Sequence, residues 1–188
     1  MDDLSRRAFQ VPQGPKPSNL TKDEIEQIAE SVAEGMRYTP SSDLSDLLPE
    51  IGGKVSVKDF WKLDGTTDES IVVQPDASFE IFVPPHTSPE RDRFTIAHEL
   101  GHYVLHFLPA SDARRAAVTF SASRYGSQRV EWEANRFAAG FLMPRGDFEK
   151  THRRYHGHIG RIAQHFNVST AAAYVRAKAL GLDTDGNH

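Results

Sequence analysis

The segment from Phe94 to His102 contains the residues whose types and spacing are best suited to chemistry. It reads Phe-Thr-Ile-Ala-His-Glu-Leu-Gly-His, so His98 and His102 stand four positions apart. Residues at i and i+4 share one face of a helix and lie about 6 Å apart along its axis, so both imidazoles can bind one divalent ion. Glu99 lies about 100° round the helix from His98, where it can accept a proton from water at that ion.

The pattern H-E-x-x-H is typical of zinc peptidases, in which a catalytic ion takes a third protein ligand and keeps one position open. The metzincin pattern would need Gly and His where this chain has Leu105 and Leu108. His106 lies about 12 Å from His98 along the same axis, too far to bind the same ion, which predicts a place behind a ligand or at the surface. Without a metal, two buried histidines beside a buried glutamate would each need unrelated polar partners.

A second helical segment, Val130 to Leu142, can supply the missing carboxylate. One face of it carries Glu131, Ala134, Asn135, Ala138 and Leu142, and the two alanines allow close approach to the first helix. We therefore expect Glu131 to point at the metal and Asn135 to hydrogen-bond a ligand histidine. Glu133 lies about 200° round the helix from Glu131 and is expected to face outward. The alternative is that both glutamates only solvate the helix.

The elements that must position these residues follow from periodicity and capping signals. Thr21 and Glu24 form a capping box for an amphipathic helix over 21–37, and Ser88 and Pro89 begin a long helix that reaches Phe107. Apolar alternation predicts three strands, and Pro and Gly mark the turns. The remaining expected elements are a short helix Ser42–Leu48 ended by Pro49, strands in Lys54–Trp61, Ile71–Gln74 and Phe79–Val83, and helices Gly160–Phe166 and Thr170–Leu180.

These elements predict an α+β fold, with a small three-stranded sheet packed against a helical core and a C-terminal helical hairpin. The turn Pro75–Ser78 should make the last two strands a hairpin. We expect a flexible lead-in over 1–20, a catalytic domain over 21–150 and a C-terminal helical extension over 151–188. Helical periodicity and strand alternation thus assign the chemistry-bearing residues to two helices of one core.

Composition limits the classes of protein to which the chain can belong. It has 188 residues, 38% of them hydrophobic, and no Cys, so any metal must be held by His and carboxylates. An apolar membrane span and a secretory leader are both missing from the sequence pattern, which makes the cytoplasm the expected location. Residues 1–110 carry 10 Lys/Arg and 19 Asp/Glu, and residues 111–188 carry 12 and 7, giving net charges of −9 and +5. The positive charge of residues 111–188 is compatible with DNA binding, but it is smaller than the charge expected of a dedicated nucleic-acid-binding domain.

Three motifs in this order resemble the ImmA/IrrE family of bacterial and phage metallopeptidases over about residues 20–180. They are His98-Glu99-Leu100-Gly101-His102, then Glu131-x-x-Ala134-Asn135-x-Phe137-Ala138, then Phe141-Leu142-Met143-Pro144. The resemblance implies that His98, His102 and Glu131 bind zinc and that Glu99 is the general base, on a compact gluzincin-like fold. It also implies cleavage of a helix-turn-helix repressor, which would relieve repression. Manganese or iron stays open, because two imidazoles and one carboxylate accept several metals.

Other interpretations remain open at this point. The chain could be a catalytically silent zinc-binding module that sequesters a repressor or a toxin–antitoxin partner, although a structural site has no need of Glu99. Ile162–Ser169 and the helix after it resemble the helix-turn-helix-like tail of the family, which either contacts DNA or packs on the core. The basic stretch His152–His158 could bind a second metal or an anion but is better explained as a solvated turn. Ser111–Arg129 could be a substrate-contacting lid or a short strand pair.

Overall fold

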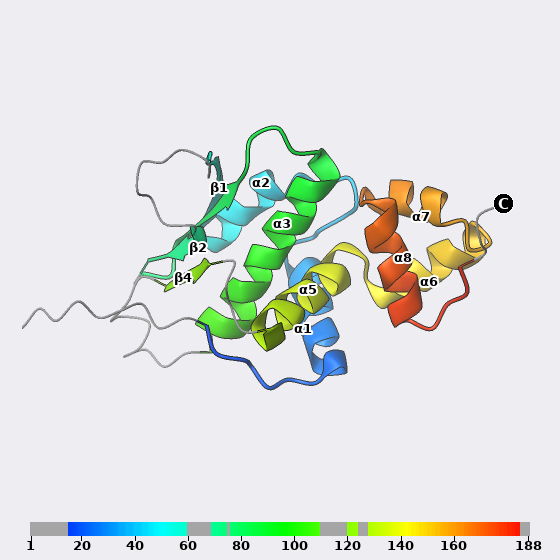
Figure 1. Ribbon diagram of the computed structural model, residues 1–188, viewed down its shortest axis with the longest axis horizontal. Helices are drawn as coiled ribbons and strands as arrows, with labels where there is room; N and C mark the ends of the chain where they lie inside the picture. Colours follow the sequence, from blue (N-terminus) through cyan, green and yellow to red (C-terminus); the bar gives the residue numbers. More distant parts are fainter. Residues whose placement is uncertain (1–14, 60–68, 75, 110–119, 124–127, 185–188) are drawn as a thin grey trace, which may run out of the picture.

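The computed structural model of the chain describes residues 15–59, 69–74, 76–109, 120–123 and 128–184. The fold is α+β, as predicted. A small sheet lies at one end, three crossing helices (α1, α3 and α5) form the middle, and three C-terminal helices lie at the other end (Figure 1). No helix in the described ranges is long and apolar enough to cross a membrane.

The first helices follow their capping signals. Helix α1 (Lys22–Gly35) begins at Thr21, whose side chain and that of Glu24 form the predicted capping box. Helix α2 (Leu44–Leu47) continues into a 3₁₀ helix, η1 (Leu48–Ile51), with Pro49 in its first turn. The α-helix ends before Pro49, as predicted, but the chain continues as an unpredicted 3₁₀ helix. A proline is tolerated there because the backbone N–H groups in the first turn of a new helical segment have no partner within the helix.

The sheet has four strands in the order β1-β3-β2-β4, one more than predicted. Strand β1 (Gly53–Val57) pairs in parallel with β3 (Phe79–Val83), which forms the predicted antiparallel hairpin with β2 (Glu69–Val73). The extra strand, β4 (Phe120–Ser123), pairs antiparallel with β2. It lies in the segment Ser111–Arg129, which the sequence allowed to be either a lid or a short strand pair. Alternate residues of β2 and β3 are buried and face the helices: Ile71, Val73, Phe79, Ile81 and Val83.

The long helix changes its winding near its end. Helix α3 (Pro89–His102) begins at Ser88, whose hydroxyl accepts a hydrogen bond from the backbone N–H of Arg91, as predicted. It passes directly into a π-helical turn, η2 (Tyr103–Phe107), in which the backbone N–H of Leu108 donates to the carbonyl of Tyr103. The predicted extent to Phe107 is therefore confirmed, with a wider last turn of a kind that is often found at functional sites.

Helix α5 (Gln128–Leu142) packs between α1 and α3 and is followed by three C-terminal helices. Helices α7 (Ile159–Phe166) and α8 (Thr170–Ala179) confirm the predicted hairpin. Helix α6 (Arg145–Arg154) was not predicted, and Pro144 stands at its N-cap as well as at the end of α5. The apolar core runs without a break from the sheet to α8. The division into a catalytic domain and an extension stays a prediction, and most of the predicted lead-in, 1–14, lies outside the described residues.

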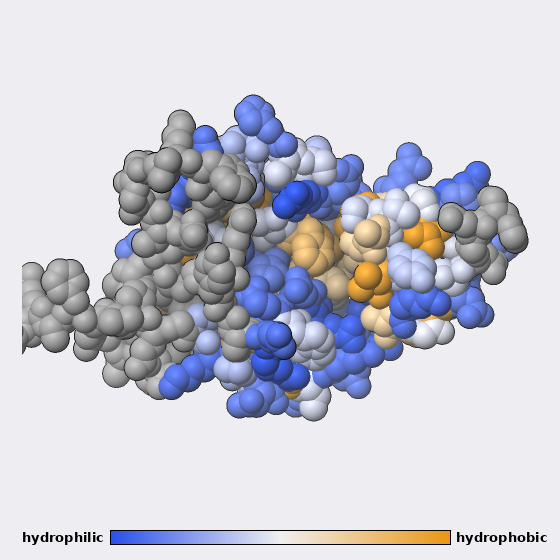
Figure 2. All heavy atoms as spheres, viewed as in Figure 1, coloured by the Kyte–Doolittle hydropathy of each residue, from blue (hydrophilic) through white to orange (hydrophobic). Residues whose placement is uncertain are grey.

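A buried ionic cluster fixes the C-terminal helices to α1. The carboxylate of Glu26, almost fully buried, contacts Arg176 Nη1 at 3.0 Å, Arg145 Nη2 at 2.8 Å and Arg136 Nε at 3.4 Å. Arg176 also donates to the carbonyl of Met143. On the face shown in Figure 2, hydrophobic side chains gather over the C-terminal helices and the adjoining ends of α3 and α5, beside a hydrophilic surface. Val175 and Tyr174 of α8 are among the exposed large apolar side chains.

Candidate metal centre

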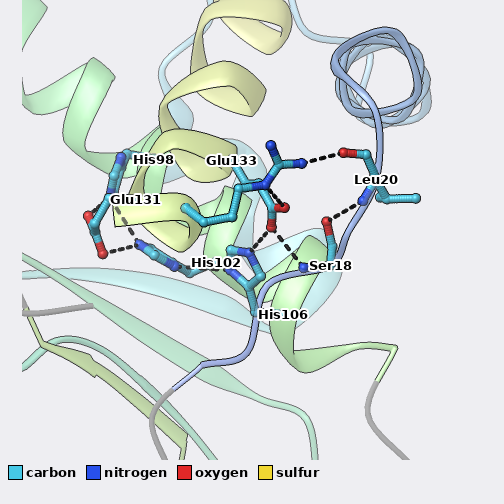
Figure 3. A network of polar contacts seen from close by, with 8 residues as sticks. Ser18, Leu20, His98, His102, His106, Glu131 and Glu133 are labelled. Atoms are coloured by element: carbon cyan, nitrogen blue, oxygen red, sulfur yellow. Dashed lines mark hydrogen bonds and ion pairs between the residues drawn. The ribbon is translucent and has the colours of Figure 1, made fainter. Parts of the chain in front are cut away.

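His98 and His102 of α3 and Glu131 of α5 point toward one another (Figure 3). The Nε2 atoms of the two histidines lie 3.0 Å apart, and Glu131 approaches them with Oε2 at 3.3 Å from His98 and Oε1 at 3.6 Å from His102. Among the residues that the structure describes, these three form the one group of His, Asp or Glu side chains whose spacing could hold a metal ion. The two helices that sequence periodicity indicated therefore bring the predicted ligands together.

The spacing of these atoms suits a four-coordinate ion. Zinc binds imidazole nitrogen and carboxylate oxygen at about 2.0–2.2 Å in tetrahedral geometry, which places neighbouring ligand atoms about 3.3–3.5 Å apart. The three observed separations, 3.0, 3.3 and 3.6 Å, bracket that range. Two nitrogens and one oxygen also suit manganese or iron, so the donor set fits a divalent ion without selecting zinc.

The far sides of both imidazoles are held by hydrogen bonds. His98 Nδ1 lies 3.0 Å from Asn135 Oδ1, so Asn135 contacts a candidate ligand histidine as predicted. His102 Nδ1 lies 3.1 Å from Nδ1 of His106. With the Asn135 oxygen as the acceptor, His98 carries its proton on Nδ1, which leaves the Nε2 lone pair free to face the cluster.

Burial and charge set the protonation of the two candidate ligand histidines. Burial lowers the pKa of His102 to about 2, and the neighbouring imidazoles of His98 and His106 add to this effect. Burial also opposes protonation of His98, but its hydrogen bond with Glu131 and the charges of Glu99 and Glu131 outweigh it and raise its pKa above the ordinary value. The negative charge around His98 that favours a proton would equally favour a metal cation.

Glu99 lies on α3 next to His98, and its side chain does not belong to the three-residue ligand group. It is 4% exposed, and its charge acts on His98. A carboxylate that is buried beside a metal site, without being a ligand, is in the position that a general base requires. The position of Glu99 is therefore compatible with the role of general base that was expected from the sequence.

Sequence reasoning misplaced Glu133. It was expected to face outward, but it is fully buried, and its Oε2 lies 2.9 Å from Nε2 of His106. The first turns of α5 are also covered on a second side, by η2 and by the chain around Ser18. The prediction assumed that only the face with Glu131 is buried, and this assumption does not hold there. The spacing of Arg129 and Glu133 at i and i+4 was a signal for their ion pair, but such pairs are usually exposed. His106 lies behind the candidate ligand His102, which is one of the two positions expected for it from the sequence; the other was the surface.

Gly101 allows α3 and α5 to approach each other between the ligands. A Cβ atom at this position would lie 3.2 Å from Cα and the carbonyl oxygen of Ala134 and from Cβ of Phe137. Two of these atoms belong to the backbone of α5, which α1 supports on its other side. The close approach that brings Glu131 to the histidines thus depends on the absence of a side chain at Gly101.

Replacing Gly101 by Leu is expected to lower the free energy of unfolding by at least about 1–3 kcal/mol, the usual cost of overpacking a core. Gly146→Leu is the matched control, because nothing lies within 4 Å of a Cβ atom at Gly146. Leu is the better helix former, so the control should keep or raise stability. Urea denaturation of both variants measures the difference, and equal stability of the two would contradict the close packing.

The other candidate sites of the sequence do not assemble in the described residues. His152 lies in the last turn of α6 and contacts the carbonyl of Asp183, and His158 caps α7. Between them Arg153, Arg154 and His156 are exposed and residues 155–157 form a turn, which agrees with the solvated turn expected for the part between the two helices. The stretch is not among the described groups whose spacing could hold a metal ion. Of the segment 111–129, β4 and the start of α5 are described. Its residues 111–119 and 124–127, including Arg114, Arg115 and Arg124, lie outside the described residues, so the lid stays a prediction.

Comparisons with known proteins agree with this geometry. A search of curated proteins finds no match. Among solved structures, a protein described as a Mycobacterium tuberculosis transcriptional regulator shares the fold, with a TM-score of 0.56 and 19% identity over 86% of this chain and 48% of that one. The chain thus spans about half the length of that protein. The family model of the IrrE N-terminal-like domain, a peptidase family, matches residues 61–178, which include α3, α5 and all three candidate ligands. Because this match covers more than half of the sequence, the chain belongs to the IrrE N-terminal-like family of peptidases.

Proposed function

We propose that the protein is a zinc-dependent endopeptidase that cuts a helix-turn-helix transcriptional repressor and so relieves repression. The observation that carries the proposal is the convergence of His98, His102 and Glu131, with both imidazoles held through their Nδ1 atoms. Three protein ligands leave a fourth position for water or substrate, which distinguishes a catalytic site from a closed structural one.

The proposed roles follow from the placement of the side chains. His98, His102 and Glu131 hold the ion, and Asn135 orients His98. The bound ion supplies the Lewis acidity that polarises a peptide carbonyl and acidifies water. Glu99, which is buried beside His98, takes the proton from the attacking water and delivers it to the leaving amine. Ligand binding and proton transfer are thus carried by different residues of α3 and α5.

The choice of a repressor as substrate rests on family membership and on the shared fold. The structural neighbour is described as a transcriptional regulator, which supports a link between this fold and gene regulation. A repressor acts in the cytoplasm, and a chain of 188 residues without Cys has no need of an oxidising compartment. The C-terminal helices are assigned a role in contacting the substrate rather than DNA, because α8 exposes Tyr174 and Val175 while Arg176 is buried.

The test is to incubate the purified, zinc-loaded protein with the helix-turn-helix repressor encoded next to it and to record intact masses. We expect two fragments whose masses sum to that of the repressor plus one water. Treatment with a chelator should abolish the fragments, and added Zn²⁺ should restore them, with Mn²⁺ and Fe²⁺ tested in parallel. A repressor that stays intact but forms a stable complex with the loaded protein would contradict the peptidase proposal and favour a sequestering module.

A further inference from the structure

A buried series of hydrogen bonds leads from His102 away from the ligand cluster (Figure 3). His102 Nδ1 lies 3.1 Å from His106 Nδ1, and His106 Nε2 lies 2.9 Å from Glu133 Oε2. Glu133 in turn accepts hydrogen bonds from Arg129 Nε at 2.7 Å and from the backbone N–H of Ser18 at 2.8 Å. The side chains of His106 and Glu133 are both 0% exposed.

With Glu133 ionised and His106 neutral, the donors and acceptors in this series can be arranged in one way only. An ionised carboxylate can only accept, and a guanidinium can only donate, so Nε2 of His106 must donate to Glu133. A neutral His106 then has an unprotonated Nδ1, which must accept the proton of His102 Nδ1. His102 is left with its lone pair on Nε2, the atom that faces His98 and Glu131. The series therefore fixes the tautomer that a metal ligand needs.

The partners of Glu133 agree with this direction. Its carboxylate pairs with Arg129 Nε at 2.7 Å and accepts the backbone N–H of Ser18 at 2.8 Å, and both of these groups can only donate. His106 therefore lies against a carboxylate whose other partners suit its ionised form.

We propose that His106 and Glu133 are positioning residues, through which the negative charge of Glu133 orients His102 and strengthens its binding of the metal ion. The proposal rests on the proposed role of His102 as a ligand. Carboxylates that hold a ligand histidine through its second nitrogen fix the ring and increase its basicity, and their loss costs about 10–100-fold in metal affinity. Here a second imidazole stands between the carboxylate and the ligand.

The two ligand histidines are held in different ways. The neutral amide of Asn135 can present either its oxygen or its nitrogen after a flip, whereas Glu133 can present only acceptors. Asn135 is also exposed, while His106 and Glu133 are buried. The fixed, charged anchor therefore belongs to His102, and it also joins the ligand to the N-terminal segment through Ser18 and through Arg129, whose Nη2 donates to the carbonyl of Leu20.

The test compares Glu133→Gln and His106→Phe with the wild type in Zn²⁺ affinity, measured by competition with a chelator. Gln keeps the size of Glu133, and its oxygen can still accept from His106 and from the Ser18 N–H, but it removes the charge and places an NH2 group opposite Arg129 Nε. We expect both variants to bind Zn²⁺ about 10–100-fold more weakly. At saturating Co²⁺, the visible absorption bands of His106→Phe should also shift, which a change in stability alone would not cause.

Glu26→Gln is the matched control, because Glu26 is also a buried glutamate paired with arginine but belongs to the cluster that holds the C-terminal helices. It should lower the free energy of unfolding and leave Zn²⁺ affinity unchanged. Variants of Glu133 and His106 that bind Zn²⁺ as tightly as the wild type would overturn the positioning role while leaving the metal site intact. A wild type that binds no Zn²⁺ would overturn both proposals.

Discussion

Replacing Glu99 by Gln is expected to reduce cleavage of the repressor by about 10²–10⁴-fold, the usual contribution of a general base. Gln has nearly the same size and shape but cannot take a proton from water. Because Glu99 is outside the ligand group, Zn²⁺ should stay bound with unchanged affinity. The variant therefore separates proton transfer from metal binding.

The measurement is the initial rate of fragment formation by intact mass, together with zinc content. Glu90→Gln serves as the control, since Glu90 lies in the first turn of the same helix, far along α3 from His98, and should keep full activity. A Glu99→Gln enzyme that cuts at the wild-type rate would contradict the assignment of the base.

Replacing Glu131 by Ala is expected to weaken Zn²⁺ binding by more than about 100-fold. This exceeds the loss of about 10–100-fold that is usual when a residue that hydrogen-bonds a metal ligand is removed. Glu131 supplies the only carboxylate of the three-residue group in the described part of the chain, and it comes from a different helix than the two histidines. Its loss leaves two imidazoles on one helix. Cleavage should be lost together with the metal, unlike the result expected for Glu99→Gln.

Chelator competition gives the affinity, and Asp147→Ala controls for the removal of an acidic side chain, because Asp147 is exposed on α6 and pairs only with Lys150 among the contacts described. The fold of the Glu131→Ala variant can be checked by circular dichroism. Zinc affinity equal to that of the wild type would exclude Glu131 as a ligand.

The candidate ligands could be predicted from the sequence because their placement needs only helix geometry. The i, i+4 spacing places His98 and His102 on one face of any helix, and the alanines beside Glu131 identify the face of α5 that can approach. Capping residues located the starts of α1 and α3 for the same local reason. Asn135 followed from its position one turn after Glu131.

Features that depend on distant parts of the chain could not be predicted in this way. Glu133 is buried by η2 and by the segment at Ser18, which is 115 positions away in sequence. The parallel pairing of β1 with β3 and the addition of β4 to the sheet likewise depend on tertiary packing. Pro144 marks the end of α5 and also the start of α6, and a sequence pattern shows only the first of these roles.

The most direct test of the central claim is an anomalous difference map from crystals of the zinc-loaded protein, with data collected on both sides of the zinc absorption edge. The account predicts one peak about 2.0–2.2 Å from Nε2 of His98, Nε2 of His102 and the carboxylate of Glu131, with no fourth protein ligand. A map without a peak among these three residues, or with a fourth side chain closing the site, would contradict it.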